Sequence, residues 1–208
     1  MANIEVFQAH ILEAGVLDPP KVHHEFVSGK HGRKLDFDTI ETGSDLYNEW
    51  VDVNVGFIVD EFPRTPEVIL GVANGTNRLS LDVARRFNGQ SLGLVSEKDP
   101  RNSKILSLNW LAARVIRAIE PELVVVVEDV GTTGSNSVQV AVQARELGAK
   151  KVIVVPTWQR QPSLGKLDEA GISYVPIIGQ TLPTFDKEDC EINGFCAEEG
   201  MLFIPREK

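Results

Sequence analysis

The sequence predicts an α/β protein with a mostly parallel sheet flanked by helices and a small N-terminal hood. From residue 68 onward, β-branched runs alternate with segments of helical periodicity, the pattern of strand–helix–strand units. The run LVVVVEDV at 123–130 lacks polar alternation, as expected for a strand buried on both faces. We therefore expect one domain over residues 1–208.

The N-terminal part is expected to combine helices with a hairpin. Apolar residues recur at helical spacing over 3–17. A short segment after Ser28-Gly29 alternates weakly and is expected to pair as a hairpin. Residues 45–62 predict a long amphipathic helix. We assign residues 1–62 to the hood and the N-terminal helices.

Residues 63–180 are expected to form the α/β core, followed by a C-terminal tail at 181–208. Strands are predicted at 68–73, 91–96, 123–130, 150–156 and 172–178. Helices are predicted at 78–87, 110–119, 138–149 and 164–171. The polar stretch EKDPRNSK at 97–104 is expected to be a loop.

Length, charge and apolar content narrow the classes of protein. The chain has 208 residues, of which 42% are hydrophobic and 25% charged, typical of a globular domain. Its net charge of -9, with scattered basic residues, argues against nucleic acid as a partner and leaves room for a phosphorylated small molecule. No apolar run is long enough to span a membrane and no signal-peptide pattern is visible, so we expect a cytoplasmic location.

Cysteine and histidine give no clear sign of a metal site. Cys190 and Cys196 do not make a disulfide framework, and two thiolates lack the four ligands that a structural zinc needs. No histidine lies near them in the sequence, so no metal is expected there. We expect His23 and His24 to be structural, and His31 to be an exposed residue of the hairpin.

The segment at 123–144, LVVVVEDVGTTGSNSVQVAVQA, carries the clearest chemistry. In a parallel sheet, ligands bind beyond the carboxyl ends of strands, where helix N-termini direct N–H groups at them. Gly131 and Gly134 allow the backbone to turn successive N–H groups inward around an anion. Glu128 and Asp129 would repel phosphate but suit ribose hydroxyls, Mg²⁺ or a developing cation. The combination indicates a ligand with both a sugar and a phosphate.

Four motifs resemble those of known enzymes. The string EDVGTTGSN at 128–136 resembles the signature of type I phosphoribosyltransferases, and it is not a Walker A loop because no Gly-Lys-Ser/Thr follows. GVANGTNRLSLDVA at 71–84 resembles the family's pyrophosphate loop. FVSGKHGRKLDFD at 26–38 and the two-cysteine tail at 188–205 resemble the orotate phosphoribosyltransferase branch.

The resemblance implies a homodimeric enzyme of nucleotide synthesis that transfers ribose 5-phosphate from phosphoribosyl pyrophosphate to a base such as orotate, with Mg²⁺. It implies that the sugar and its 5-phosphate are bound by Glu128, Asp129, Val130, Gly131, Thr132, Thr133, Gly134, Ser135 and Asn136. The pyrophosphate would be surrounded by Gly71, Val72, Ala73, Asn74 and Gly75. Glu128 and Asp129 would act as catalytic groups on the ribose, and Asp129 would contact the metal indirectly.

The catalytic loop departs from the orotate branch. That branch carries an Arg-Lys pair, a second lysine and a histidine, whereas the stretch at 95–107 here offers Lys98, Arg101 and Lys104 and no histidine. We expect Lys98 to be the catalytic cation. The reduced loop also leaves open an alternative function, a regulator that binds phosphoribosyl pyrophosphate without catalysis.

The base site departs as well. We expect Thr132, Lys30 and Trp158 to contact the base. Trp158 stands where the orotate branch has an arginine for the orotate carboxylate, and an indole stacks on a ring but cannot pair with a carboxylate. Either Arg160 takes over that role, or the acceptor is a base other than orotate.

Overall fold

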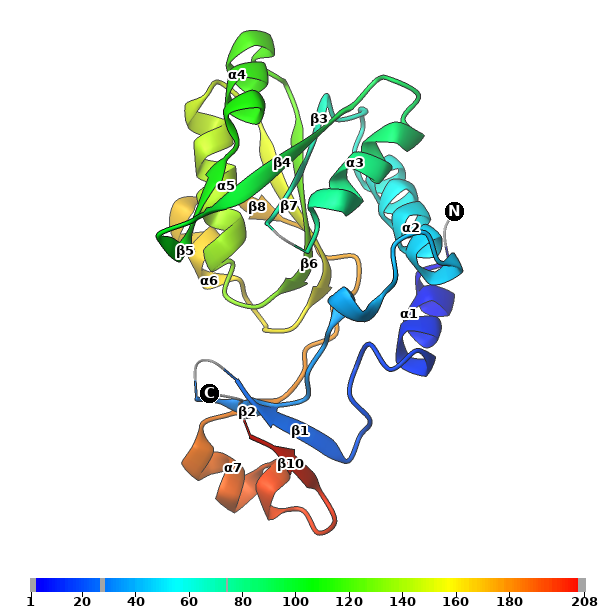
Figure 1. Ribbon diagram of the computed structural model, residues 1–208, viewed down its shortest axis with the longest axis vertical. Helices are drawn as coiled ribbons and strands as arrows, with labels where there is room; N and C mark the ends of the chain where they lie inside the picture. Colours follow the sequence, from blue (N-terminus) through cyan, green and yellow to red (C-terminus); the bar gives the residue numbers. More distant parts are fainter. Residues whose placement is uncertain (1–2, 27–28, 74, 206–208) are drawn as a thin grey trace.

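The computed structural model describes residues 3–26, 29–73 and 75–205. Two lobes are visible in Figure 1, an α/β core and a smaller hood at its lower end. The core contains a six-stranded sheet in the order β5-β4-β3-β6-β7-β8, and the hood a four-stranded sheet in the order β10-β1-β2-β9.

The core sheet is parallel except at one edge. Its strands are β3 (Val68–Gly71), β4 (Leu92–Asp99), β5 (Asn102–Leu108), β6 (Val124–Gly131), β7 (Val152–Gln159) and β8 (Ser173–Tyr174). Only β4 and β5 pair antiparallel among these strands, while β3, β4, β6, β7 and β8 run parallel to their neighbours. The predicted fold class, a mostly parallel sheet flanked by helices, is confirmed.

Helices cover both faces of this sheet. They are α1 (Ile4–Glu13), α2 (Asp45–Glu61), α3 (Asn77–Arg86), α4 (Trp110–Ile119), α5 (Ser135–Glu146) and α6 (Gly165–Ala170). Val125 and Val127 of β6 belong to the apolar cluster that includes α1, α2 and α3, whereas Val124 and Val126 belong to the cluster with α4, α5 and α6. Because side chains alternate across a strand, an unbroken valine run fills two cores at once.

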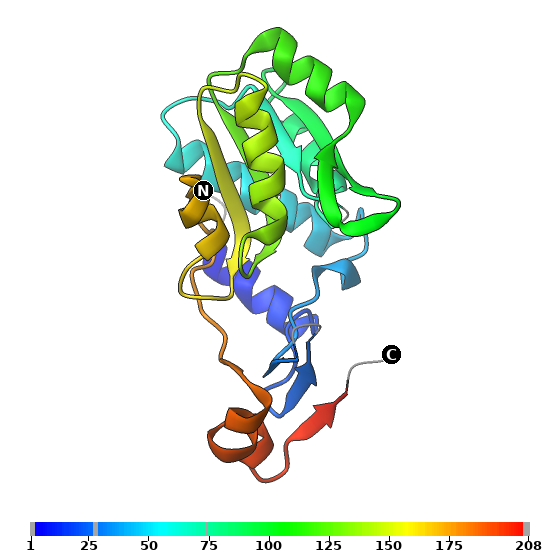
Figure 2. The ribbon, with the colours of Figure 1, turned by 90° about the vertical axis from the view of Figure 1, so that its left-hand side faces the viewer.

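One element of the core differs from its prediction. Residues 97–104, expected to be a polar loop, form the outer part of the β4–β5 hairpin, which Figure 2 shows as a green arm extending from the sheet. The side chain of Gln139 on α5 accepts a hydrogen bond from Leu106 N at 2.9 Å and donates to Lys104 O at 3.2 Å. These contacts with a neighbouring helix order a polar strand that lacks an apolar alternation of its own.

The hood takes strands from both ends of the chain. They are β1 (Val22–Glu25), β2 (His31–Gly32), β9 (Thr184–Phe185) and β10 (Leu202–Ile204), accompanied by α7 (Lys187–Asn193) and the 3₁₀ turns η1 (Phe37–Thr39) and η2 (Phe195–Ala197). Strand β10 pairs parallel with β1, and β9 pairs antiparallel with β2. The C-terminal tail is therefore part of the hood.

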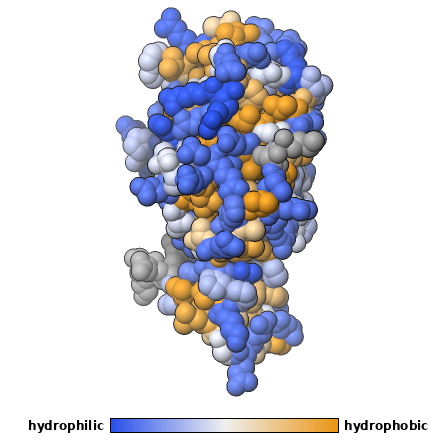
Figure 3. Space-filling model, turned by 90° about the vertical axis from the view of Figure 1, so that its right-hand side faces the viewer, coloured by the Kyte–Doolittle hydropathy of each residue, from blue (hydrophilic) through white to orange (hydrophobic). Residues whose placement is uncertain are grey.

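The described residues include no membrane-spanning helix. No helix in the described part of the chain combines the length and apolar character needed to cross a bilayer. On the face drawn in Figure 3, hydrophobic residues are scattered among hydrophilic ones.

Candidate active site

The segment at 128–136, called loop 128–136 below, contains the end of the central strand β6, a turn and the start of α5. β6 ends at Gly131 and α5 begins at Ser135, so the turn between them is tight. Gly134 has a φ of 73°, and a Cβ atom there would lie 2.8 Å from Leu167 Cγ. Only glycine fits both demands. The turn ends where the first N–H groups of α5 have no intrahelical acceptor, which is a favourable position for an anion.

Hydroxyl groups surround this turn. Thr132 and Thr133 are exposed, and the Thr133 and Ser135 hydroxyls lie 2.7 Å apart. Ser137 is buried beneath them, 3.4 Å from the Gly134 carbonyl that accepts its hydrogen bond. The turn thus offers exposed hydroxyl donors beside the helix N-terminus, the arrangement that phosphate oxygens require.

Glu128 occupies an environment that disfavours its charge. The residue is buried, and its Oε2 atom has no hydrogen-bond partner among the described residues. Burial and the neighbouring Asp129 raise the pKa of Glu128 to about 8, against a smaller opposite effect of the Ser137 hydroxyl. An unsatisfied buried carboxyl is costly and is typical of functional positions.

Asp129 lies among other acids. Its pKa is raised by burial and by the negative charges of Asp38 and Asp36, although a 2.7 Å hydrogen bond from Val130 N to Asp129 Oδ1 opposes the rise. A Cβ atom on Gly75 would stand 3.1 Å from Asp129 Oδ2 and 3.4 Å from Asp38 Oδ1. The loop after β3 therefore meets a group of carboxylates from β6 and the hood connection.

The loop after β3 uses part of its backbone internally. The N–H of Val72 donates to Thr76 Oγ1 at 2.9 Å, and the N–H of Ala73 donates to Ser96 Oγ at 2.8 Å. Both residues are buried, whereas Gly75 is exposed. Asn74, also predicted to contact pyrophosphate, lies outside the described residues. Among the described loop residues, Gly75 is the one placed to approach a ligand.

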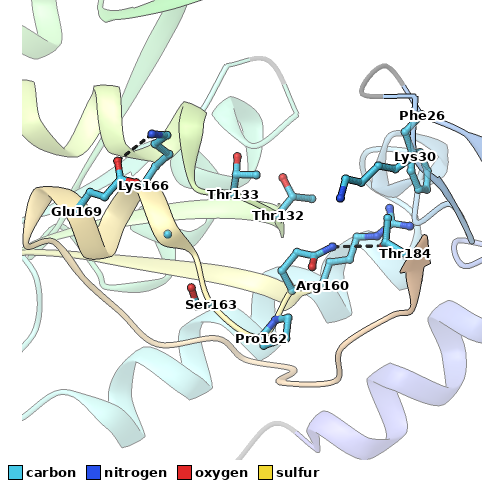
Figure 4. A pocket seen from close by; sticks show the side chains of 12 residues that line it. Phe26, Lys30, Thr132, Thr133, Arg160, Pro162, Ser163, Lys166, Glu169 and Thr184 are labelled. Carbon is cyan, nitrogen blue, oxygen red and sulfur yellow. Dashed lines mark hydrogen bonds and ion pairs between the residues drawn. The ribbon is translucent and has the colours of Figure 1, made fainter. Parts of the chain in front are cut away.

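A pocket of about 860 Å³ opens between the hood and the carboxyl end of the sheet. It is lined by Phe26, Lys30, Thr132, Thr133, Arg160, Gln161, Pro162, Ser163, Gly165, Lys166, Glu169 and Thr184. Figure 4 shows Lys30 and Arg160 on the hood side, Lys166 with Glu169 on the opposite side, and Thr132 and Thr133 between them. The predicted residues Lys30, Thr132 and Thr133 therefore meet in one cavity.

Arg160 is the principal charged group at the hood side of this pocket. Its guanidinium lies 4.1 Å from the Phe26 ring centroid, and Nη2 donates to the Arg33 carbonyl at 2.6 Å. Burial lowers the pKa of Arg160 to about 10, so it still carries its charge at neutral pH. Its Nε atom is buried without a hydrogen-bond partner among the described residues. A buried cation with an unused donor is suited to an anionic ligand.

The structure does not support the predicted role of Trp158. The indole is fully buried, and its Nε1 donates to the Gln180 carbonyl at 2.6 Å. Trp158 is paired with Val130 inside the sheet because β7 runs to Gln159, beyond the expected end of the strand. The indole therefore packs in the core, and Arg160 lines the pocket instead.

Lys98 lies on the β4–β5 hairpin. It is exposed, pairs with Leu106 across the hairpin, and is not among the residues that line the pocket. Its catalytic role stays a prediction.

The structure adds residues that the sequence did not single out. Asp38 and Phe26 belong to the segment at 26–38 that resembles the orotate branch, so the motif marked their neighbourhood without marking their roles. Lys166 and Glu169 form a 2.8 Å ion pair at the pocket edge. The sequence predicted their helix, but helical periodicity alone does not show that a helix borders a pocket.

The fold is similar to that of solved phosphoribosyltransferases. The orotate phosphoribosyltransferase of Aeropyrum pernix superposes with a TM-score of 0.64 at 18% identity, over 82% of this chain and 91% of that one. A Saccharomyces cerevisiae adenine phosphoribosyltransferase, crystallised with adenine and an imino-altritol bisphosphate, superposes with a TM-score of 0.62 at 13% identity, over 84% and 99%.

In sequence, the chain is similar to orotate phosphoribosyltransferases. The enzyme of that name from Caldanaerobacter subterraneus subsp. tengcongensis is 30% identical over 138 residues, which is 66% of this chain. The match spans 64% of that relative's own length. No family model matches the chain.

Proposed function

We propose that the protein is a phosphoribosyltransferase that binds phosphoribosyl pyrophosphate on loop 128–136 and transfers its ribose 5-phosphate to a nucleobase, releasing pyrophosphate. The observation that carries the proposal is the tight turn at Gly134, where exposed hydroxyls and a helix N-terminus follow directly after the buried Glu128 and the partly buried Asp129 at the end of β6. The sequence similarity to orotate phosphoribosyltransferases supports it.

The residues fit the charge changes of such a transfer. As pyrophosphate leaves, positive charge develops on the ribose, and carboxylates fixed beside it stabilise that charge. Glu128 and Asp129 are assigned this role. The turn at Thr132, Thr133 and Gly134 holds the 5-phosphate, so that the ribose is oriented between the acids and the pocket.

Mg²⁺ also fits the acids present. Asp129 and Asp38 approach the same side of Gly75, and burial together with the negative charge of Asp38 raises the pKa of Asp129. Carboxylate oxygens are the donors that Mg²⁺ prefers, often through water. When bound with the pyrophosphate, the ion would neutralise part of its charge, and Asp129 would face it indirectly.

The base is proposed to be orotate or a related flat acid. Arg160 and Lys30 supply positive charge to the pocket, and the Phe26 ring lies beside them. An acidic ring would bring negative charge to the Arg160 guanidinium, whereas a neutral purine would leave this buried cation with only the compensation that Asp18 provides.

The test is pyrophosphate release from phosphoribosyl pyrophosphate with Mg²⁺ across a panel of acidic and neutral bases. We expect turnover with orotate or a close relative. Stabilisation against heat by phosphoribosyl pyrophosphate, without turnover on any base, would favour the regulator instead. The specific support for that second function is the hairpin, whose exposed Lys98, Arg101 and Lys104 include no histidine.

A homodimer and a cytoplasmic location complete the proposal, by analogy with the enzymes that the chain resembles. Light scattering on the purified protein gives its mass directly. A chain mass of 22.9 kDa would be doubled in the dimer.

A further inference from the structure

A cluster of two histidines and two cysteines lies in the hood. His23 comes from β1, His31 from β2, Cys190 from α7 and Cys196 from η2. The ligand atoms of these four side chains all lie within 4.8 Å of one another. His23 Nε2 is 3.2 Å and His31 Nδ1 is 3.3 Å from Cys196 Sγ. The sequence-based expectation that the cysteines lack histidine partners is therefore wrong.

The spacing of these atoms matches a tetrahedral metal site. With Zn–S of about 2.3 Å and Zn–N of about 2.0 Å, the edges of the ligand tetrahedron measure about 3.3–3.8 Å. The two histidine–cysteine distances, 3.2 and 3.3 Å, are slightly shorter than the mixed N–S edge of about 3.5 Å. All four ligand atoms lie within 4.8 Å of one another, so side-chain shifts of about 1 Å or less bring them onto a tetrahedron. Two thiolates with two imidazoles form one of the common ligand sets of structural zinc.

The surroundings resemble the outer shell of a metal site. The N–H of Cys196 donates to Cys190 Sγ at 3.3 Å, the contact that stabilises a negatively charged sulfur. His23, His31 and Cys190 are buried, while Cys196 lies at the surface of a cavity of about 410 Å³. An ion can therefore enter from solvent and then be enclosed on its other sides.

The hood has little apolar packing of its own to stabilise it. None of its four strands contributes a residue to either of the two apolar cores of the molecule. Its aromatic packing includes His23 and His31 against Phe203, and Phe195 against His23 and Phe185, with Phe203 39% exposed. Small lobes that cannot bury enough apolar surface are commonly stabilised by a metal.

We propose that His23, His31, Cys190 and Cys196 bind one zinc ion, which fastens the C-terminal segment to the hood. The ion would join residues more than 150 positions apart in the chain. Its contribution is structural, because all four positions are filled by protein and none is left for a substrate.

The site also borders the pocket. On β2, His31 faces the cluster, whereas a Cβ atom on the next residue, Gly32, would lie 2.7 Å from Arg160 Nη2. Zinc would therefore fix the strand that Arg160 packs against. The zinc site itself does not depend on the proposed transferase activity.

Metal content tests the proposal first. Protein produced without a metal-binding tag and purified without chelators should contain about one zinc ion per chain by elemental analysis. After the zinc is exchanged for Co²⁺, the visible bands of tetrahedral cobalt and a thiolate charge-transfer band should appear. A protein free of zinc that gives no such cobalt spectrum under reducing conditions would overturn the proposal.

Variants identify the ligands. Cys196→Ser and His31→Gln should each lower zinc affinity by at least about tenfold in a competition with a coloured chelator. His24→Gln is the matched control, because His24 lies on the same strand but contacts Asp18, with 3.2 Å between Nε2 and Oδ1. Equal loss of zinc from all three variants would contradict the assignment. So would a Cys190–Cys196 disulfide, detected as an absence of free thiols in the native protein as isolated.

Discussion

Among single residues, Glu128 determines how the site responds to pH. Its carboxyl is buried beside Asp129 with one oxygen unpaired, and its pKa is raised to about 8. In the free protein the protonated form of Glu128 is therefore favoured to a higher pH than in an exposed glutamate. A ligand that offers hydroxyl groups to this carboxyl would supply the partners that the protein lacks.

The variant Glu128→Gln isolates this effect on stability. The pKa of Glu128 is raised from 4.5 to about 8 in the folded protein. The wild-type protein therefore keeps its full stability below pH 4.5 and loses stability as the pH rises toward 8, because over that range only the unfolded state releases the proton. Glutamine cannot ionise. We expect the stability of the variant relative to wild type to grow by about 4 kcal/mol at most between pH 5 and pH 9, measured by urea unfolding. Glu122→Gln, an exposed change, should show no such trend.

Among the elements, the loop after β6 was the most predictable and the end of β7 the least. The sequence at 128–136 indicates a strand end, a turn and a helix start, because its glycines permit the tight turn and its hydroxyl residues suit an anion at a helix N-terminus. The end of β7 could not be predicted, since Pro156 suggests a stop. Pairing with β6 carries the strand to Gln159 and buries Trp158, which shifts the pocket-facing position to Arg160.

Gly134→Ala tests the turn itself. Gly15 has the same φ of 73° but open space around it, so Gly15→Ala measures backbone strain alone, about 1 kcal/mol. Gly134→Ala adds a contact of 2.8 Å with Leu167. We expect it to cost roughly 2–4 kcal/mol and to weaken phosphoribosyl pyrophosphate binding at least about tenfold. Calorimetry and urea unfolding measure the two effects, and equal behaviour of the two variants would refute the assignment of the turn.

A substitution on the β4–β5 hairpin tests whether this hairpin takes part in catalysis. Lys98→Ala removes an exposed side chain, so stability should stay within about 0.5 kcal/mol of wild type. If Lys98 stabilises the leaving pyrophosphate, kcat should fall by about tenfold to a hundredfold. Lys104→Ala, on the same hairpin and also exposed, should retain kcat. Equal kcat values for both variants would remove Lys98 from the mechanism.

At the scale of the whole molecule, the pocket depends on contacts that no local pattern reveals. The hood sheet needs β9 and β10 from the C-terminal segment, and these strands are too short to show periodicity. The sequence therefore predicted an N-terminal hood and a separate tail. Likewise His31 and Cys196 are 165 positions apart, and only the fold brings them together.

Arg160 joins the two lobes, and its replacement tests both the base and the architecture. It extends from the end of β7 to the Arg33 carbonyl and the Phe26 ring of the hood. Arg160→Met removes the charge but keeps much of the apolar stem. Since a hydrogen bond to a charged group contributes about 1.5–3 kcal/mol, we expect the KM for an acidic base to rise at least about tenfold, with the KM for phosphoribosyl pyrophosphate little changed.

Lys166→Met is the matched control for this variant. Lys166 lines the same pocket, but it is exposed and paired with Glu169 at 2.8 Å, so its charge is largely compensated. The KM for the base should stay close to that of wild type in steady-state assays. If both variants raise it equally, the pocket responds to total charge rather than to the buried guanidinium. If Arg160→Met raises the KM for both substrates together, the arginine acts by holding the hood in place and does not contact the base.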